Sequence, residues 1–126
     1  MLAEWCAQFA QAEPLAIKIR SWNSYIDLCD VRDVVRAYRL LITSGQRGET
    51  YNVGSGQGRT SGEIFELLRQ LCDPARDFIA DRAAPPRYTP VADISKLTRA
   101  TQWRPEIPLE QTLRDTYAWC AAHRAG

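Results

Sequence analysis

The stretch SYIDLCDVRDVVRAY, residues 24–38, shows most clearly how this chain passes from an extended segment into a helix. Tyr25–Cys29 predicts a short extended segment. Asp30 follows as an N-cap, and Asp33 places a carboxylate in the first turn, where free backbone N–H groups attract negative charge. The apolar residues that come next keep helical spacing and predict a buried face: Val31, Val34, Val35, Tyr38 and Leu41. Ser44-Gly45 ends this helix, because glycine favours the left-handed stop.

Outward from this stretch, helices alternate with short strands. Further helices are predicted at residues 2–9, 61–71, 94–100 and 109–123, with a capping box at Thr60–Glu63 and a cap at Asp93. Strands are predicted at 15–20, 50–53 and 77–80, and Glu13-Pro14 breaks the first helix. Residues 54–58 and 81–90 are predicted loops. The alternation predicts an α/β fold with about five helices and a few short strands.

The composition fits one soluble globular domain. Of 126 residues, 45% are hydrophobic, and 16 Lys and Arg stand against 15 Asp and Glu. A net charge of +1 argues against nucleic-acid and membrane-surface partners, which select a basic excess. No apolar run approaches the ~18 residues that cross a bilayer, and the N-terminus lacks the pattern of a signal peptide. We therefore expect a cytoplasmic protein.

The cysteines do not predict a metal site. Cys6, Cys29, Cys72 and Cys120 lie far apart in the sequence, and His123 is the only histidine. Zinc sites need clustered Cys and His ligands, so none is predicted. We interpret the four cysteines as small, mostly buried apolar residues; a disulfide and a reactive thiol are the alternatives.

A glycine-rich turn and an arginine-bearing loop are the first candidate sites. Residues 51–58, YNVGSGQG, resemble a dinucleotide-binding turn, but Arg59 stands where the third glycine belongs. We reject a complete nicotinamide site and expect a flexible turn. On the loop 81–88, Arg82, Arg87 and an aromatic ring could clamp a diphosphate. The alternative is a solvated surface loop.

Other charged residues point to structure more than to chemistry. Arg32, Arg36 and Arg39 share one helical stripe, which we interpret as the solvated side of an amphipathic helix, with partner contact as the alternative. The acidic residues Asp30 and Asp33 already have helix-start roles. No serine has a positioned base, so a catalytic triad is excluded and no catalytic residue is predicted.

Three segments resemble motifs of the extended short-chain dehydrogenases/reductases. Residues 24–38 resemble SYRDFxDVRDVVRAY, and residues 48–56, GETYNVGSG, resemble GExYNVGSG. Residues 93–97 with 103–113 resemble DxSKL…GWxPxxxLEETL. The most similar branch is the nucleotide-sugar epimerase/dehydratase group, especially GDP-mannose 4,6-dehydratases and GDP-4-keto-6-deoxymannose reductases. The resemblance implies a single partial domain, residues 1–126, equivalent to the C-terminal substrate-binding lobe without most of the Rossmann domain.

The family's catalytic and cofactor motifs have no counterpart in this sequence. The complete enzymes use NAD(P), a GxxGxxG turn and a Tyr-x-x-x-Lys pair. Only Lys18 and Lys96 are present, and the residues four positions before them are Pro14 and Ala92. The resemblance therefore implies a nucleotide-sugar-binding portion, with GDP-sugar as the expected class, that does not transfer hydride alone. The alternatives are a non-enzymatic oligomerisation or partner-binding module and a folded gene remnant.

The resemblance carries two substrate contacts onto this chain. Arg82 falls near the family's loop arginine that contacts the nucleotide diphosphate or ribose, and Arg87 is its rival because the loop is about one residue longer. Ile26 replaces a further arginine, which costs roughly 1.5–3 kcal/mol of binding. The 50–53 strand is expected to leave an unpaired edge. We therefore expect a homo-oligomer or association with a missing N-terminal half.

Overall fold

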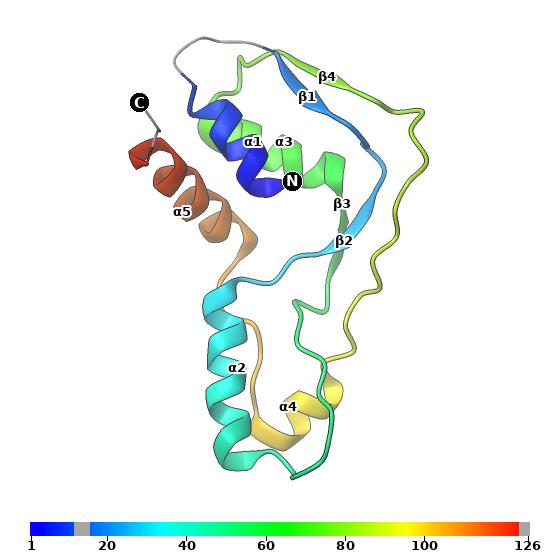
Figure 1. The fold of residues 1–126 in the computed structure, drawn as a ribbon, viewed down its shortest axis with the longest axis vertical. Coiled ribbons are helices and arrows are strands. Elements are labelled where there is room, and N and C mark those ends of the chain that lie inside the picture. Colours follow the sequence, from blue (N-terminus) through cyan, green and yellow to red (C-terminus); the bar gives the residue numbers. More distant parts are fainter. Residues whose placement is uncertain (12–15, 124–126) are drawn as a thin grey trace.

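The computed structural model describes residues 1–11 and 16–123 (Figure 1). Within these ranges the chain forms five helices, α1 (Leu2–Phe9), α2 (Val31–Ser44), α3 (Ser61–Cys72), α4 (Ser95–Thr101) and α5 (Leu109–Ala122). It also forms four short strands, β1 (Ile17–Ile19), β2 (Tyr25–Asp27), β3 (Gly58–Thr60) and β4 (Phe78–Ala80). The predicted α/β content is confirmed. The predicted break at Glu13-Pro14 and the first predicted strand residue, Leu15, lie outside the described residues.

Local capping begins two of the helices where the sequence predicts. The Asp30 side chain accepts a hydrogen bond from the backbone N–H of Arg32 at 2.9 Å, which starts α2. Thr60 and Glu63 form the reciprocal capping box of α3. The backbone N–H of Ser95 donates to Asp93, although α4 itself begins only at Ser95. These helix starts depend on neighbouring residues alone.

The strands pair as two separate ribbons. β1 and β4 are parallel, with Lys18 opposite Ile79. β2 and β3 are antiparallel, with Ile26 opposite Arg59. The β1–β4 ribbon runs along one side of α1 and α3 in Figure 1, and β2 and β3 lead toward α2. The β2–β3 ribbon therefore lies between the upper helices α1, α3 and α5 and the lower helices α2 and α4 (Figure 1).

Two hydrophobic clusters divide the core. The larger joins α1, α3 and α5 through buried residues that include Trp5, Phe9, Phe65 and Leu113. The Trp5 and Phe65 rings meet edge to face, with centroids 5.4 Å apart. The smaller consists of Ala37, Leu97 and Trp103 between α2 and α4. No helix of the described ranges is both long and apolar enough to cross a bilayer.

Two predictions about extended segments and one about a buried face are wrong. Residues 50–53 form no strand, and a strand lies instead at residues 58–60, which begin at the last residue of the expected loop. The reason is tertiary, because β2 supplies its hydrogen-bonding partner to Gly58–Thr60. Three of the five residues on the predicted core face of α2 are exposed, Val31 by 70%, Val35 by 51% and Tyr38 by 58%, whereas Leu41 packs against the smaller cluster. Ala37 and the carboxylate of Asp33 are buried in their place.

Candidate functional site

A cavity of about 450 Å³ lies between α1, β1 and the loop that follows β4. Its lining combines apolar residues with cations and hydroxyl groups: Met1, Glu4, Trp5, Lys18, Arg20, Ser21, Ser24, Ile26, Ser61, Ala84, Pro85, Arg87 and Thr89. We call it the cationic cavity. Lys18, Arg20 and Arg87 line it, and Glu4 is the one carboxylate that the described residues contribute to it. Such a balance favours an anionic ligand.

Strand alternation places two of these cations. Ile17 and Ile19 are buried in the core, so Lys18 and Arg20 point to the opposite side of β1. Arg20 approaches Glu4 only at 4.0 Å, with both side chains exposed, and this contact leaves its guanidinium available to a ligand. Sequence reasoning missed both residues, although the alternation in IKIR was the signal that could have found them.

Backbone hydrogen bonds hold Arg87 against β2. Its N–H donates to the Ser24 hydroxyl at 3.1 Å, and its carbonyl accepts from the N–H of Tyr25 at 2.8 Å. The N–H of Thr89 then donates to the carbonyl of Tyr25 at 2.9 Å. The main chain at Arg87 is thus anchored where its side chain lines the cationic cavity. One of the two arginines expected to contact substrate therefore lies at a cavity with other cations.

Arg82 has a different environment. Its guanidinium lies 4.2 Å from the ring centroid of Trp22, an arrangement typical of a cation–π contact. Trp22 in turn stacks on Phe78 at 5.6 Å. Arg82 does not belong to the lining of either cavity. The structure thus separates Arg82 from Arg87 instead of joining them in one clamp.

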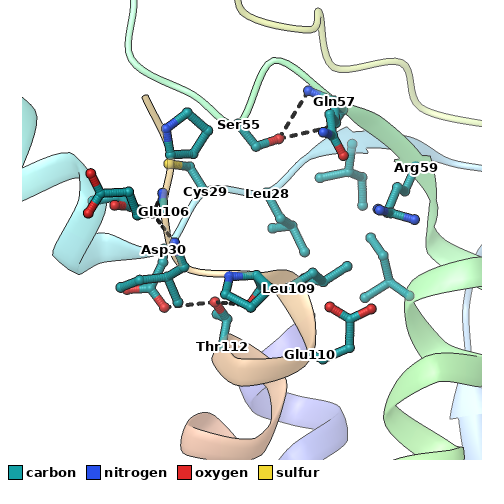
Figure 2. A pocket seen from close by; sticks show the side chains of 16 residues that line it. Leu28, Cys29, Asp30, Ser55, Gln57, Arg59, Glu106, Leu109, Glu110 and Thr112 are labelled. Carbon is teal, nitrogen blue, oxygen red and sulfur yellow. Dashed lines mark hydrogen bonds between the residues drawn. The ribbon is translucent and has the colours of Figure 1, made fainter. Parts of the chain in front are cut away.

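The smaller cavity, about 320 Å³, lies between the β2–β3 ribbon and the start of α5. Figure 2 shows Gln57 and Arg59 on the ribbon side and Leu109, Glu110 and Thr112 on the α5 side. Ile26 lines both this cavity and the cationic one. The two cavities therefore share a wall at position 26.

Several acids in the smaller cavity are already bound by protein groups. Arg32 bridges Asp30 and Asp115, with N–O distances of 2.8 Å to each. Thr112 also donates to Asp30, at 2.7 Å. The bonds from Arg32, and to a smaller extent from Thr112, lower the pKa of Asp30 despite its burial. Asp30 is therefore a charged structural group and not a proton donor at neutral pH.

The solvated-stripe interpretation of the α2 arginines fits the exposed Arg32 and Arg39, although Arg32 is ion-paired, and is wrong for the half-buried Arg36. Arg32 ties α2 to α5. Arg36 bonds Asp33 at 2.7 Å, Glu106 at 3.0 Å and the carbonyl of Arg104, so it ties α2 to the segment before α5. Of these three arginines, only Arg39 forms no ion pair among the described residues. These ion pairs join α2 to segments far away in the sequence, and helical periodicity does not predict such contacts.

The glycine-rich turn is ordered around Asp27. Its carboxylate accepts hydrogen bonds from the N–H groups of Ser55 at 2.9 Å and Gly56 at 3.3 Å, and from Ala92 at 3.0 Å. Burial raises the pKa of Asp27, but these bonds and the Ser55 hydroxyl outweigh it and lower the pKa. The expected flexible turn is thus a fixed one.

The same turn does not fit a dinucleotide. A pyrophosphate is bound by free backbone N–H groups after such a turn. Here the N–H groups of Ser55 and Gly56 already bind a carboxylate, which would also repel phosphate. Among the described residues, no group of three His, Cys, Asp or Glu is arranged to hold a metal ion.

The chain is similar to enzymes that modify nucleotide sugars, although no family model matches it. It is 35% identical over 91 residues to GDP-6-deoxy-D-mannose reductase of Pseudomonas aeruginosa, which covers 70% of this chain and 30% of that enzyme. It is 31% identical over 110 residues to dTDP-glucose 4,6-dehydratase of an Actinoplanes species, covering 85% of this chain and 32% of the relative. The chain thus spans about a third of these relatives.

Solved structures agree with the sequence relatives. RMD from Pseudomonas aeruginosa, complexed with NADPH, matches 96% of this chain with a TM-score of 0.83 and 30% identity; the match covers 42% of that structure. UDP-glucose 4-epimerase from Thermotoga maritima, with UDP-glucose, matches 94% with a TM-score of 0.76 and 26% identity, covering 38% of that structure. The fold is therefore one that longer proteins contain as less than half of their length.

Proposed function

Since the chain is homologous to the C-terminal part of extended short-chain dehydrogenases/reductases, we propose that it is the nucleotide-sugar-binding portion of a dehydratase, epimerase or reductase. The observation that carries this proposal is the convergence of Lys18, Arg20 and Arg87 on one cavity. Guanidinium groups bind phosphate oxygens in a bidentate manner, and the ammonium group adds a point charge. The diphosphate of the ligand therefore lies among these three cations.

The other lining residues suit the remainder of such a ligand. Trp5 and Ile26 offer apolar surface, and Ser21, Ser24 and Thr89 offer hydroxyl groups for hydrogen bonds. We propose a GDP-sugar as the ligand class, which agrees with the similarity to GDP-6-deoxy-D-mannose reductase. Arg82 remains a proposed contact from outside the cavity, reached by a ligand that extends toward Trp22.

Hydride transfer is not part of the proposed function of this chain alone. The sequence carries no Tyr-x-x-x-Lys pair, and its glycine-rich turn binds Asp27 in place of a pyrophosphate. NAD(P) belongs to the complete enzymes of this family. The chain supplies the residues that bind and orient the substrate, in the cytoplasm, where its four free thiols stay reduced.

Calorimetric titration tests the binding function directly. The chain is titrated with GDP, GDP-mannose and dTDP-glucose, and Arg87→Ala is compared with Arg114→Ala, which removes an exposed cation of α5 outside both cavities. Micromolar binding of a GDP ligand that Arg87→Ala weakens about tenfold or more supports the proposal. No binding up to millimolar concentration contradicts it. Addition of NADPH with a GDP-sugar should give no turnover.

A second candidate function, a partner-binding module, is favoured by α2. Four apolar residues recur along one side of this helix and are exposed to different degrees: Val31, Val35, Tyr38 and Ile42. Ile42 is 84% exposed. We call these four residues the α2 stripe. Exposed apolar stripes of this kind mark interaction surfaces.

We propose that the α2 stripe binds a polypeptide equivalent to the part that the longer relatives contain in addition. This occupant follows from length, because the chain covers only 30% of GDP-6-deoxy-D-mannose reductase and 42% of the RMD structure. Residues 51–53 have no backbone hydrogen-bond partner in the described part of the chain, and a strand of that polypeptide can supply one. Self-association through the same stripe is the competing outcome.

A further inference from the structure

One cation that lines the smaller cavity, Arg59, forms no ion pair among the described residues. Arg59 lies in the middle of β3, directly opposite Ile26 of β2. Side chains of directly opposed residues in an antiparallel pair project from the same face, with Cβ atoms about 5 Å apart. The guanidinium of Arg59 therefore projects from the same face of the ribbon as the Ile26 side chain.

Arg59 is also free to bind a ligand. Its side chain is exposed, and it forms no ion pair within the described residues, whereas Arg32 and Arg36 each contact two carboxylates. The nearby Glu63 is held by the backbone N–H of Thr60 at 2.6 Å and by its hydroxyl at 2.9 Å. Arg59 is thus a cation without an ion pair among the described residues, in a cavity whose lining also includes the carboxylate of Glu110.

We propose that Arg59 binds the diphosphate of the nucleotide sugar across Ile26, from the strand opposite to it. This inference rests on the proposed function and adds a residue to it. Ile26 lines both cavities, so a long and flexible side chain that reaches over it joins Lys18, Arg20 and Arg87 at the cationic cavity. Ile26 carries no charge, and Arg59 on the opposite strand supplies a positive one.

The test compares GDP with guanosine, which lacks the diphosphate, by calorimetry on the full chain. We expect Arg59→Ala to weaken GDP binding about tenfold or more and to leave guanosine binding unchanged. Arg114→Ala, the exposed control of α5, should bind both like the unmodified chain. The double variant Ile26→Arg/Arg59→Ile moves the guanidinium from β3 to the directly opposed position on β2. We expect it to bind GDP more tightly than Arg59→Ala and nearly as tightly as the unmodified chain. Circular dichroism checks that each variant is folded.

Three results would overturn the proposal. Unchanged GDP binding by Arg59→Ala, while Arg87→Ala loses it, removes Arg59 from the site and leaves the proposed function standing. An equal loss of guanosine and GDP binding assigns Arg59 to the shape of the site instead of the diphosphate. Absence of GDP binding by the unmodified chain up to millimolar concentration overturns the proposed function and this inference with it.

Discussion

The indole Nε1 of Trp103 donates a hydrogen bond to the main-chain oxygen of Asp33 at 3.0 Å, across 70 residues of sequence. Both residues are buried, each with 1% of its surface exposed. The Asp33 carboxylate also accepts from the backbone N–H groups of Glu106 and Ile107, both at 3.0 Å. One residue of α2 therefore holds Trp103, Glu106 and Ile107 of the segment between α4 and α5, part of which lines the smaller cavity.

Removal of the Asp33 charge should destabilise the fold. Asp33→Asn keeps the shape but loses the ion pair with Arg36 and weakens the bonds to Glu106 and Ile107. We expect a loss of about 2–3 kcal/mol in the free energy of unfolding. Urea denaturation at pH 7, followed by tryptophan fluorescence, measures it. Asp77→Asn, at an exposed position without an ion pair in the described residues, is the control, and equal effects of the two substitutions would refute this role.

Acid should destabilise the protein through the same group. Burial raises the pKa of Asp33, but the bonds from Arg36, Ile107 and Glu106 bring it below the ordinary value of 3.8. The folded state thus binds fewer protons than the unfolded one, so the stabilisation is complete above the unfolded pKa and is lost as the pH falls through the lower folded value. We expect this contribution to be constant above about pH 5 and to decline below about pH 4. Urea denaturation across this range should show that the free energy of unfolding falls less steeply with pH in Asp33→Asn than in the parent chain. An equally steep fall in both would show that other groups cause the acid sensitivity.

Gly62 should not tolerate a methyl group. Alanine normally stabilises a helix by about 1 kcal/mol relative to glycine. A Cβ on Gly62 would lie 2.4–2.8 Å from atoms of the Trp22 indole, so Gly62→Ala should instead destabilise by about 1–3 kcal/mol. Thermal unfolding measures the sign. In a Trp22→Leu background the penalty should shrink, and a stabilising Gly62→Ala in the parent chain would show that Trp22 moves freely.

Charge on the α2 stripe should prevent partner binding without unfolding the chain. Ile42→Glu changes a side chain that is 84% exposed, so we expect a stability change within about 0.5 kcal/mol. The measurement is association with the separately expressed N-terminal part of the Pseudomonas aeruginosa reductase, by size exclusion with light scattering. Thr43→Glu, an exposed position on another side of α2, is the control. Self-association of the parent chain that Ile42→Glu abolishes would favour a second copy as the occupant.

Helix α2 shows that apolar periodicity predicts a helix correctly but does not predict which face is buried. Its start at Asp30 and its length agree with the sequence, but the face predicted to be buried is exposed at Val31, Val35 and Tyr38. Periodicity reports that one side is apolar and does not report what covers it. In this chain the core side of α2 is Ala37 together with the buried carboxylate of Asp33, which depends on partners 70 or more positions away.

Some residues of the candidate site could be predicted from the sequence, and others could not. The sequence and its resemblance indicated two arginines, Arg82 and Arg87. Of these two, only Arg87 lines the cationic cavity. Lys18 and Arg20 could have been found from the alternation around Ile17 and Ile19. Arg59 could not, because its place opposite Ile26 depends on a strand register between residues more than 30 positions apart.

By itself, the sequence determined the α/β alternation, the helix starts at Asp30 and Thr60, and the similarity to nucleotide-sugar enzymes, because caps and motifs depend on residues that are close in the chain. Only the tertiary structure decided that Asp27 occupies the glycine-rich turn, that Asp33 is buried and that Arg59 stands opposite Ile26. Those relationships join distant segments through hydrogen bonds and charge pairs, whose energy depends on distance and burial and leaves no periodic trace in the sequence.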